Sequence, residues 1–522
     1  MRLFTTIAGL CRHVQQQRQS MGTERLGLVP TMGALHAGHV SLMKRARQEC
    51  GAVVVSIFVN PLQFGPQEDF HRYPQTLEGD RQLCEAAGVD AVFAPTVEEL
   101  YGSADLAAGS DHTGLTQVLP PPAMMAVLCG PHRPGHFEGV ATVVTKLFTI
   151  VQPDRAYFGQ KDAQQLAILR RLVQDLNLPV TVVSCPTVRE ADGLAMSSRN
   201  RYLSPEERSQ APILYRALSH AQQQFKRGII DRWALINAVA STLATTPSVR
   251  PHYVDLVHPH TMKPLEKVND QGLLAIAAHV GPARLIDNVL LTTRKPIIAI
   301  DGPAGAGKST VVRRVAADLG LLYLDTGAMY RAVTWLVLHS GIALTDEAAI
   351  AELVSQCDIR LENEDQAEMR APTQKVWING QEVTREIRSA EVTSQVSGVA
   401  AQQAVREALV QQQQAYGKRG GVVMDGRDIG THVFPDAELK IFLTASVQER
   451  ARRRHLDLKE QGQPEISLES LEQSIYERDL KDSSRAIAPL RKASDAVEIN
   501  TDRLTVDQVV DTIVSLYQEA VR

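Results

Sequence analysis

The stretch Ile297-Ile-Ala-Ile-Asp-Gly-Pro-Ala-Gly-Ala-Gly-Lys-Ser309 decides the fold of the second half of the chain. A short apolar run leads into the pattern G-x-x-x-x-G-K-S, and a helical pattern follows over 309–319. A glycine-rich turn between a buried strand and a helix directs backbone N–H groups and the helix N-terminus at phosphate oxygens. These residues therefore predict a phosphate-binding loop inside a parallel α/β domain.

The residues of this loop have separate tasks in binding ATP. The glycines turn backbone N–H groups inward, the lysine reaches the β- and γ-phosphates, and the serine hydroxyl binds Mg²⁺. The ATP-binding residues expected here are Gly302, Gly305, Gly307, Lys308, Ser309 and Thr310, with Lys308 as the catalytic one. The loop predicts a nucleoside triphosphate as donor but does not identify the acceptor.

Toward the N-terminus, apolar runs and helical patterns alternate as in a doubly wound α/β domain. We expect strands over 26–30, 52–60, 91–94, 155–158 and 180–185, and helices over 6–19, 39–49, 77–87, 140–151 and 163–176. After residue 204, helical patterns over 205–227 and 232–243 and strand patterns over 252–257 and 273–278 indicate a smaller α+β domain. The predicted organisation is an α/β domain over 1–186, the α+β domain over 187–290, a linker over 291–296 and the phosphate-binding α/β domain over 297–522.

The composition excludes several classes of protein. The chain has 522 residues and a net charge of −4, which gives no overall attraction to nucleic acid or anionic membranes. Six cysteines are scattered without a C-x-x-C pair, so reduced thiols are expected rather than a zinc ribbon or a disulfide framework. There is no apolar run long enough for a membrane span and no secretory signal pattern, and we expect a cytoplasmic protein. The glutamine run Gln411–Gln414 is expected on a solvated helix face.

A second candidate nucleotide site follows the first long apolar run of the chain. His36-Ala-Gly38-His39 stands at the start of an expected helix. Two imidazoles on either side of a glycine let the backbone approach a triphosphate closely while the rings contact its phosphate oxygens. A metal site is the alternative interpretation, but the pattern lacks the third ligand and the spacing of a common zinc site.

Three further polar clusters stand near ends of expected strands or in loops of the first two predicted domains. Lys161 and Asp162 follow the strand at 155–158, at the edge where α/β ligand sites lie. Ser197 and Arg199 place a hydroxyl and a guanidinium on a loop, for which a surface turn is the alternative interpretation. Gln63 offers an amide that donates to a carboxylate and accepts from a hydroxyl, which suits a hydroxy acid.

Taken together, residues 1–290 resemble pantothenate synthetase, a Rossmann-like member of the HxGH nucleotidyltransferase superfamily. The resemblance rests on the segments 30–42, 58–64, 133–148, 152–154, 158–162, 186–204 and 284–288. The loop around Ser197 is also similar to the mobile phosphate-binding loop of class I aminoacyl-tRNA synthetases. The resemblance implies ATP-dependent joining of (R)-pantoate to β-alanine through a pantoyl-adenylate, with release of AMP and pyrophosphate.

The residue roles that this resemblance implies are carried over position by position. Pantoate and β-alanine would lie against Met32, Gln63 and Gln165. ATP would lie on Met32, His36, Gly38, His39, Gly159, Lys161, Asp162, Val188, Met196, Ser197 and Arg199. The catalytic set is His36, His39, Lys161, Ser197 and Arg199, with Arg133 ordering the adjoining loop and Asp80 holding Mg²⁺ through water. Thr149 and Ala163 depart from the family's usual residues, and we expect those departures to affect packing rather than activity.

Residues 296–522 resemble bacterial cytidylate kinase, a P-loop nucleoside monophosphate kinase. The segments that carry the resemblance are 300–310, 325–331, 376–388, 425–431 and 477–490. It implies phosphorylation of CMP or dCMP by ATP and Mg²⁺, with a lid over 451–463 and an inserted substrate-binding region over 361–399. The CMP-binding residues would be Thr326, Arg331, Arg406, Arg427, Asp428, Arg478, Asp482 and Arg485. The two aspartates suit the cytosine amino group and the sugar, and the arginines suit the phosphate; Thr326 replaces the family's frequent serine.

The leading hypothesis is a single chain that carries two enzymes, acting on pantoate, β-alanine, CMP or dCMP and ATP, without nucleic acid or membrane partners. One alternative is an enzyme joined to a module that binds ATP without turnover. Another alternative is an RNA-binding protein, which the charge balance and the lack of interleaved basic and aromatic residues disfavour. The pantothenate synthetase family further implies a homodimer through the N-terminal half.

Overall fold

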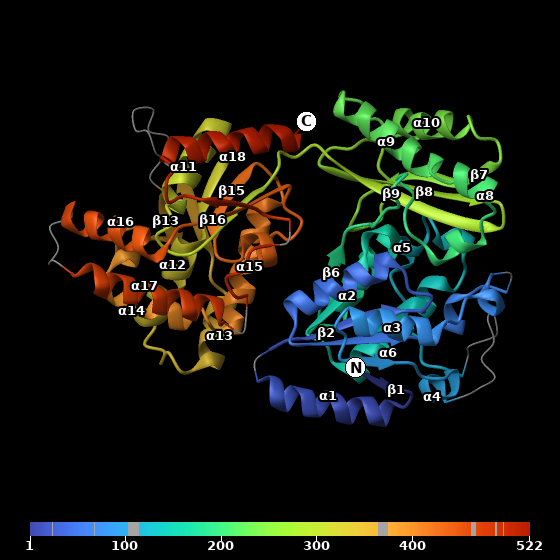
Figure 1. Cartoon of the computed structure of the whole chain (residues 1–522), viewed down its shortest axis with the longest axis horizontal. Helices are drawn as coiled ribbons and strands as arrows, with labels where there is room; N and C mark the ends of the chain where they lie inside the picture. The colour runs from blue at the N-terminus through green and yellow to red at the C-terminus, as the bar shows by residue number, and fades with distance from the viewer. Residues whose placement is uncertain are drawn as a thin grey trace. The chain divides into compact units, whose positions relative to one another are not determined.

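The computed structural model divides into two compact units, Met1–Thr293 and Arg294–Arg522 (Figure 1). The structure describes residues 1–521 apart from 23, 67, 103–113, 364–373, 461–465, 486–487 and 494. In the described part of the chain, no helix has the length and apolar content needed to cross a bilayer.

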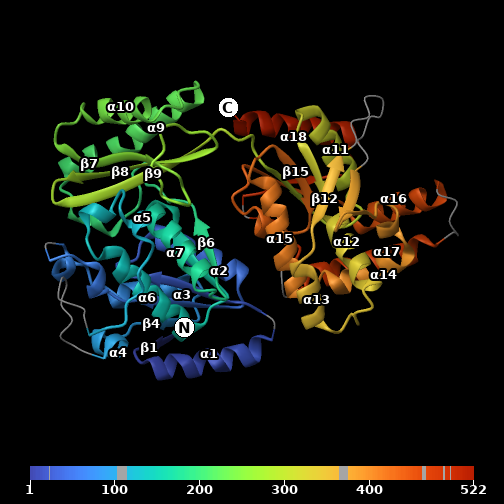
Figure 2. The same cartoon turned by 180° about the vertical axis from the view of Figure 1, so that it is seen from behind.

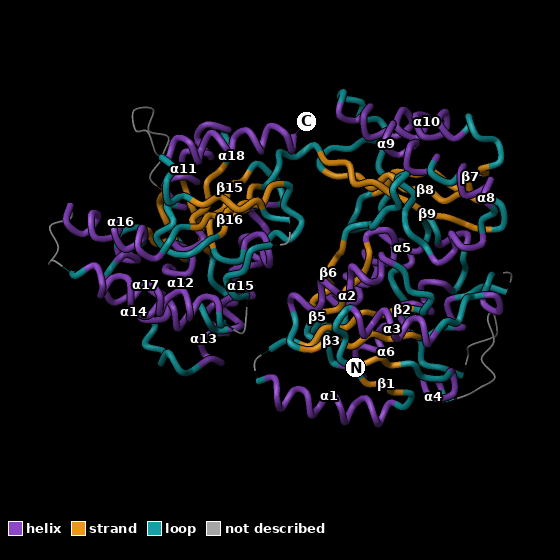
Figure 3. Tube along the Cα trace, in the orientation of Figure 1, coloured by secondary structure: helices purple, strands orange, loops and turns teal. Residues whose placement is uncertain are grey.

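A parallel sheet forms the centre of the first unit, with its strands drawn in orange in Figure 3. Its six strands have the order β1-β4-β3-β2-β5-β6. Its strands are β1 (Arg2–Phe4), β2 (Leu26–Thr31), β3 (Ala52–Ile57), β4 (Ala91–Phe93), β5 (Arg155–Gly159) and β6 (Thr181–Cys185). From β2 the chain proceeds through β3 and β4 on one side and later through β5 and β6 on the other. The strand order therefore reverses between β2 and β5, which is the point where open α/β sheets bind ligands.

Helices cover both faces of this sheet. On one face, α1 (Ile7–Met21), α6 (His136–Val151) and α7 (Ala163–Asp175) contribute to one buried apolar cluster, whose members include Leu10, Val144 and Leu169. On the other face, α2 (Ala37–Glu49) and α3 (Leu77–Ala86) pack against Val53 and Val55 of β3. Shorter pieces complete this part: α4 (Val97–Tyr101), α5 (Pro122–Met125), and the 3₁₀ turns Pro61–Gln63, Phe70–Arg72, Gly130–His132, Gln160–Asp162 and Ser198–Tyr202.

The first unit ends with an antiparallel sheet in the order β7-β8-β9 (Figure 2). Its strands are β7 (Val249–Val257), β8 (Gln271–Val280) and β9 (Ala283–Thr292). The helices α8 (Pro205–Gln210), α9 (Ile213–Lys226) and α10 (Arg232–Leu243) precede it. Apolar residues of α9 and α10, such as Leu218 and Leu235, form one core with Leu274 and Ile276 of β8.

The second unit contains a five-stranded parallel sheet in the order β11-β15-β10-β16-β17. Its strands are β10 (Ile298–Asp301), β11 (Leu322–Asp325), β15 (Val422–Gly426), β16 (Leu439–Thr444) and β17 (Val497–Asn500). The helices α11 (Lys308–Leu319) and α18 (Val506–Val521) pack on one face, where Val312 and Ile513 are fully buried. Because β10 is central, the glycine-rich loop that follows it emerges at the middle of the sheet.

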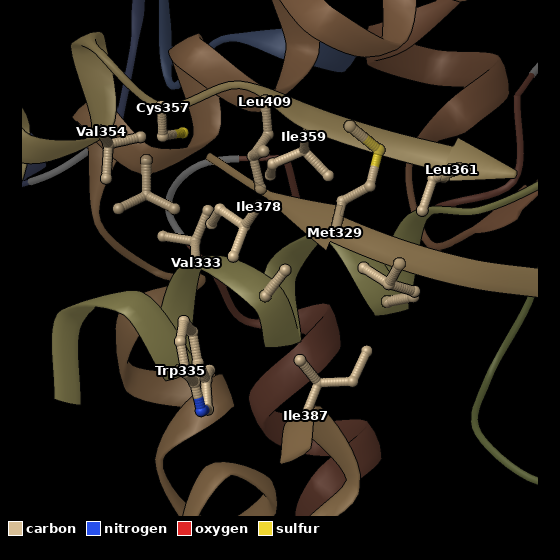
Figure 4. Packing of buried hydrophobic residues seen from close by; sticks show 14 of the residues in the cluster. Met329, Val333, Trp335, Val354, Cys357, Ile359, Leu361, Ile378, Ile387 and Leu409 are labelled. Atoms are coloured by element: carbon tan, nitrogen blue, oxygen red, sulfur yellow. The ribbon is translucent and has the colours of Figure 1, made fainter. Parts of the chain in front are cut away.

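The other face carries α12 (Thr326–His339), α13 (Glu347–Ser355), α14 (Ala390–Val399) and α15 (Gln403–Gly417). A small antiparallel sheet of β12 (Ile359–Asn363), β13 (Gln374–Ile378) and β14 (Gln381–Glu382) packs on α12. Figure 4 shows Met329 and Val333 of α12 beside Ile359 and Ile378 of this sheet. A 3₁₀ turn (Glu386–Arg388), a π-helical turn (Ile429–Val433) and the helices α16 (Val447–Glu460) and α17 (Leu468–Ser483) complete the unit.

Departures from the expected elements have local causes. The strand expected over 52–60 ends at Ile57, because Asn60 caps a short 3₁₀ turn by accepting a hydrogen bond from the Leu62 N–H (3.3 Å). The helix expected over 205–227 is split into α8 and α9 near Pro212, which has no N–H to continue the helical ladder. The strand β9, which the patterns did not indicate, continues to Thr292, so the first two residues of the expected linker belong to the sheet.

The expectation of a solvated glutamine face was wrong for Gln413. Its side chain is only 1% exposed, within α15. The neighbouring Gln412 and Gln414 donate to the carbonyl oxygens of Cys357 (2.8 Å) and Val433 (3.0 Å). The run therefore helps fix α15 to adjacent segments.

Candidate functional sites

A cavity of about 240 Å³ lies at the strand reversal between β2 and β5. The loop after β2 carries the two histidines, the turn after β5 carries Lys161, and the loop before α8 carries Ser197 and Arg199. The residues expected in the first site that line this cavity are Met32, His36, Gly38, His39, Gln63, Gly159, Lys161, Asp162, Gln165, Val188, Met196, Ser197 and Arg199. Segments distant in the sequence therefore meet at one place.

The two histidines are fixed by hydrogen bonds at the start of α2. The Gly38 N–H donates to His36 Nδ1 (3.1 Å), and the His36 N–H points to His39 Nδ1 (3.4 Å). Since both Nδ1 atoms accept, each neutral ring carries its proton on Nε2. Burial lowers the pKa of His36 to about 4, and burial together with His36 lowers that of His39 to about 3. A Cβ at position 38 would meet the His36 ring at 2.8 Å, so glycine is required there.

The turn after β5 is held from the antiparallel sheet. Asn288 of β9 donates through Nδ2 to the carbonyl oxygens of Gln160 (3.0 Å) and Lys161 (2.9 Å). Burial lowers the pKa of Lys161 from its ordinary value. These bonds fix the backbone of the turn from which the Lys161 side chain enters the cavity.

The amide of Gln63 has a defined orientation. Asn60 Nδ2 donates to Gln63 Oε1 (3.2 Å), while Asn60 Oδ1 accepts from the Tyr101 hydroxyl (2.8 Å). Gln63 Nε2 lies 2.9 Å from Met32 Sδ and is the side of the amide available to donate to a bound carboxylate. The backbone carbonyl of Gln63 accepts from His136 Nδ1 (2.8 Å), so α6 also fixes this residue.

Two arginines that line the cavity, Arg133 and Arg199, are each paired with a carboxylate that does not line it. Arg199 donates to both carboxylate oxygens of Asp69, at 3.0 and 2.8 Å. Arg133 does the same with Glu68, at 2.6 and 2.7 Å. Arg133 also contacts His136 Nε2 (2.9 Å), which connects its ion pair to the support under Gln63.

A cavity of about 380 Å³ occupies the corresponding position in the second unit, at the end of β10. The residues expected here that line it are Gly305, Gly307, Lys308, Ser309, Thr310, Thr326, Arg331, Arg406, Arg427, Asp428, Arg478, Asp482 and Arg485. Lys308 is 6% exposed and donates to the carbonyl oxygens of Gly302 and Pro303, both at 2.7 Å. Burial and the nearby Arg427 lower the pKa of Lys308 well below its ordinary value.

Gly302 does not line this cavity, in contrast to its expected contact with ATP. Its φ is +148°, and a Cβ there would meet the Leu443 carbonyl oxygen at 2.1 Å. The glycine is needed for the close approach of the loop to β16, and its carbonyl holds Lys308.

Paired charges line the part of the cavity away from the glycine-rich loop. Arg406 forms an ion pair with Asp428, and both are at most 5% exposed. Asp482 accepts from Arg427 (3.0 Å) and from Arg485. These groups offer both hydrogen-bond acceptors and guanidinium donors to one ligand.

A carboxylate lies beside the serine of the loop. Ser309 Oγ donates to Asp425 Oδ2 (3.0 Å), and Asp425 Oδ1 is buried without a hydrogen-bond partner among the described residues. Burial, with the neighbouring Asp325, raises the pKa of Asp425 to about 6. A hydroxyl and an unsatisfied carboxylate oxygen together are oxygen ligands suited to Mg²⁺.

Comparisons with known proteins agree with the division of the chain into two units. The model of the pantoate-beta-alanine ligase family matches residues 2–290, and the cytidylate kinase model matches residues 298–519. A bifunctional pantoate ligase/cytidylate kinase of Trichormus variabilis is 58% identical over 99% of both chains. The chain belongs to the bifunctional pantoate ligase/cytidylate kinase family.

Other relatives fit this assignment. A protein of the same name from a Synechocystis species is 58% identical over 99% of both chains. The crystal structure of pantothenate synthetase from Thermus thermophilus matches with 48% identity and a TM-score of 0.50, covering 55% of this chain and 99% of its own. We call Met1–Thr293 the ligase unit and Arg294–Arg522 the kinase unit.

Asp80 has a structural position in the ligase unit rather than the expected Mg²⁺ contact. It is 2% exposed and does not line the cavity. Its carboxylate accepts from the N–H groups of Ala34 (2.9 Å) and Leu35 (2.8 Å). These bonds hold the loop between β2 and α2, because buried N–H groups require partners.

Several residues that line the cavities were missed from the sequence. In the ligase unit, Val140, Val143 and Leu147 of α6 form an apolar wall. In the kinase unit, Val396, Ser397 and Ala400 line the cavity beside Asp325, Tyr330 and Asp425. The position of Asp425 at the end of β15 was a usable signal, since parallel strands present ligand-binding side chains at their carboxyl ends.

Parts of the kinase expectations lie outside the described residues. The expected lid over 451–463 is described as far as Glu460, within α16. Residues 364–373 of the expected inserted region, and Ala486 and Ile487 of the last motif, are also outside the described residues.

Proposed function

We infer that the chain catalyses two reactions, one in each unit: ATP-dependent condensation of pantoate with β-alanine, and ATP-dependent phosphorylation of CMP. The observation that carries this inference is that each unit has a cavity at the carboxyl ends of its parallel strands, lined by most of the residues expected to bind nucleotide. The full-length similarity to bifunctional relatives supports the same pair of activities.

In the first half-reaction of the ligase, a pantoate carboxylate oxygen attacks the α-phosphorus of ATP, and the bond from that phosphorus to pyrophosphate breaks. The Nε2–H groups of His36 and His39 donate to the phosphates, and Lys161 supplies positive charge. Fixed donors of this kind stabilise charge that spreads onto the leaving group. The attacking carboxylate is already ionised, so no general base is required.

In the second half-reaction, the amine of β-alanine attacks the acyl carbon of the adenylate, the acyl–oxygen bond breaks, and AMP leaves. Gln63 Nε2 is placed to hold pantoate during both steps, and Gln165 lines the same cavity. The apolar wall of α6 excludes water from the adenylate, which protects it from hydrolysis.

In the kinase unit, a phosphate oxygen of CMP attacks the γ-phosphorus of ATP, and ADP leaves. Arg331, Arg427, Arg478 and Arg485 are the groups proposed to bind the CMP phosphate, while Asp428 and Asp482 accept from the nucleoside. Ser309 and Asp425 fit a Mg²⁺ ion, which when bound neutralises phosphate charge. Lys308 would exchange its loop carbonyls for the β- and γ-phosphates.

The proposal extends to the compartment and the assembly. All six cysteines are free thiols, which suits a reducing cytoplasm. A homodimer through the ligase unit and the absence of nucleic acid partners stay predictions.

Product analysis on the purified chain tests the proposed function. With ATP and Mg²⁺, we expect AMP and pyrophosphate when pantoate and β-alanine are supplied, and ADP when CMP is supplied. Chromatographic separation of the nucleotides distinguishes the two. A unit that binds ATP but forms no product would be a binding module, and its part of the proposal would fall.

The protonation of the two histidines predicts a pH dependence. Their pKa values of about 4 and about 3 lie below the ordinary 6.5, so both rings stay neutral from pH 6 to 8. Pantoate-dependent exchange of pyrophosphate into ATP should therefore show no loss of rate with rising pH near 6.5. A loss of rate with a midpoint near 6.5 that is absent from His36→Gln would mean that a charged imidazole is the active form.

A further inference from the structure

A third cavity, of about 450 Å³, lies beside the ligase site and has no part in the reaction as described so far. It is lined from the loop that contains Glu68 and Asp69, and from the turn between β8 and β9. Three histidines face it, and the rings of His132 and His252 are 3.9 Å apart. Its lining carries both carboxylates and cations.

A small cavity of about 70 Å³ shares lining residues with this space and with the ligase site. It shares Arg133, Arg199 and Arg284 with the third cavity. It shares His136, Lys161 and Gln165 with the ligase cavity. The series of cavities therefore reaches the ligase site beside Gln165 and beside the proposed ATP-binding residues Lys161, Asp162, Ser197 and Arg199, and not at the histidines of α2.

Of the three arginines between these cavities, two are neutralised by carboxylates. Arg133 pairs with Glu68, and Arg199 pairs with Asp69. Arg284 forms no ion pair within the described part of the chain. Its Nε donates to His252 Nδ1 (3.0 Å) and one terminal nitrogen points to Cys129 Sγ (3.4 Å), so its neighbours are uncharged acceptors.

His252 does not compensate this charge. Its Nδ1 accepts from Arg284, and burial together with His132 lowers its pKa, so the ring is neutral. A guanidinium with no carboxylate partner in a cavity wall is a binding site for an external carboxylate. The carboxylates of Glu68 and Asp69 on the same cavity retain lone pairs that can accept from an ammonium group.

We propose that the third cavity is the entry site of β-alanine, with Arg284 binding its carboxylate. This proposal rests on the ligase function inferred above. During the second half-reaction, the adenylate occupies the ligase cavity from His36 to Gln63, and the amine must reach the acyl carbon from a side that the adenylate leaves open. The passage past Arg284 provides that side, and the two charges of the amino acid match the two kinds of group along it.

The test uses Arg284→Gln in the full chain, with Arg216→Gln on the exposed part of α9 as the matched control. Loss of a charged hydrogen bond predicts an increase in KM for β-alanine of at least about tenfold. The KM values for ATP and pantoate, and the rate of pantoate-dependent pyrophosphate exchange, should be unchanged. Hydroxylamine, a neutral amine without a carboxylate, should trap the adenylate at the same rate in the variant and the unaltered chain.

Arg72→Glu gives a second measurement that does not depend on a buried residue. Arg72 lines the third cavity, is exposed, and lines neither of the other two cavities. Reversing its charge should raise KM for β-alanine without changing pyrophosphate exchange, and the increase should shrink at high salt. If Arg284→Gln does not fold, this variant decides.

The outcomes separate the proposal from the function on which it rests. An unaltered chain without pantoate-dependent exchange would refute the ligase function itself. Normal exchange with an unchanged KM for β-alanine in both variants would overturn the entry site. Altered inhibition by pyrophosphate with an unchanged KM for β-alanine would also overturn it, and would assign the cavity to the leaving group.

Discussion

Lys308→Ala should abolish CDP formation, a loss of at least about 1,000-fold, and leave pantothenate formation unchanged. The reason is that Lys308 is the cation at the centre of the glycine-rich loop, already held in place by the carbonyls of Gly302 and Pro303. Alanine removes the positive charge that would stabilise the transferred phosphoryl group, and it removes the side chain that binds the loop carbonyls. The measurement is the rate of ADP and CDP formation from ATP and CMP.

The ligase unit of the same chain is the internal control for this variant. The division at Thr293 places Lys308 in the other unit, so AMP formation from pantoate and β-alanine should proceed at the normal rate. Lys418→Ala, an exposed lysine of the kinase unit, controls for the loss of a lysine and should retain full activity. Loss of both activities in Lys308→Ala would contradict two independent sites.

Lys161→Ala and His39→Ala should each lower pantoate-dependent turnover by at least about 100-fold. Both side chains line the cavity where the phosphates are proposed to bind. The protein fixes the backbone of Lys161 through Asn288 and the ring of His39 through the His36 N–H. Donors that are already in position need no reorganisation when negative charge develops on the phosphates. Deleting one of them therefore raises the free energy of the transition state more than that of the bound substrates. Single-turnover formation of AMP measures the adenylation step.

The controls for these variants separate chemistry from folding. Lys44→Ala changes an exposed lysine of α2 and should keep the normal rate. His39→Asn retains an acceptor at the helix start but cannot reproduce the Nε2–H donor, so it should be as slow as alanine while more stable. A near-normal rate in Lys161→Ala or His39→Ala would remove that residue from the mechanism.

The sequence predicted the parallel sheets, and most of the site residues it predicted line the two cavities, because short motifs at strand ends specify both. The glycine-rich loop and H-x-G-H each follow an apolar run, and the structure places both at the carboxyl edge of a sheet. The support behind them was not predictable from one sequence. Asp80 of α3 accepts a hydrogen bond from the Leu35 N–H, 45 residues earlier in the chain. No local sequence pattern indicates a contact between residues so far apart.

The burial of Gln413 and the strand β9 also could not be predicted from local sequence. A run of glutamines is expected to be exposed to solvent, but tertiary packing buries Gln413 in the kinase unit. The strand β9, Ala-Arg-Leu-Ile-Asp-Asn-Val-Leu-Leu-Thr, has no regular alternation of polar and apolar residues. Its pairing with β8 gives it its conformation. Long-range packing, and not local preference, determines these elements.

The bidentate pair between Arg199 and Asp69 has a consequence for selectivity in a cell. Asp69 occupies Arg199, one of the residues proposed to bind ATP, although Asp69 itself does not line the ligase cavity. An incoming anion that binds Arg199 is therefore in competition with a tethered carboxylate. A single inorganic phosphate or a metabolite carboxylate offers no more than Asp69 already does, and it gains little by replacing it. A triphosphate that also contacts Lys161 and the two histidines does gain, and the empty enzyme is thereby protected against the abundant small anions that surround it.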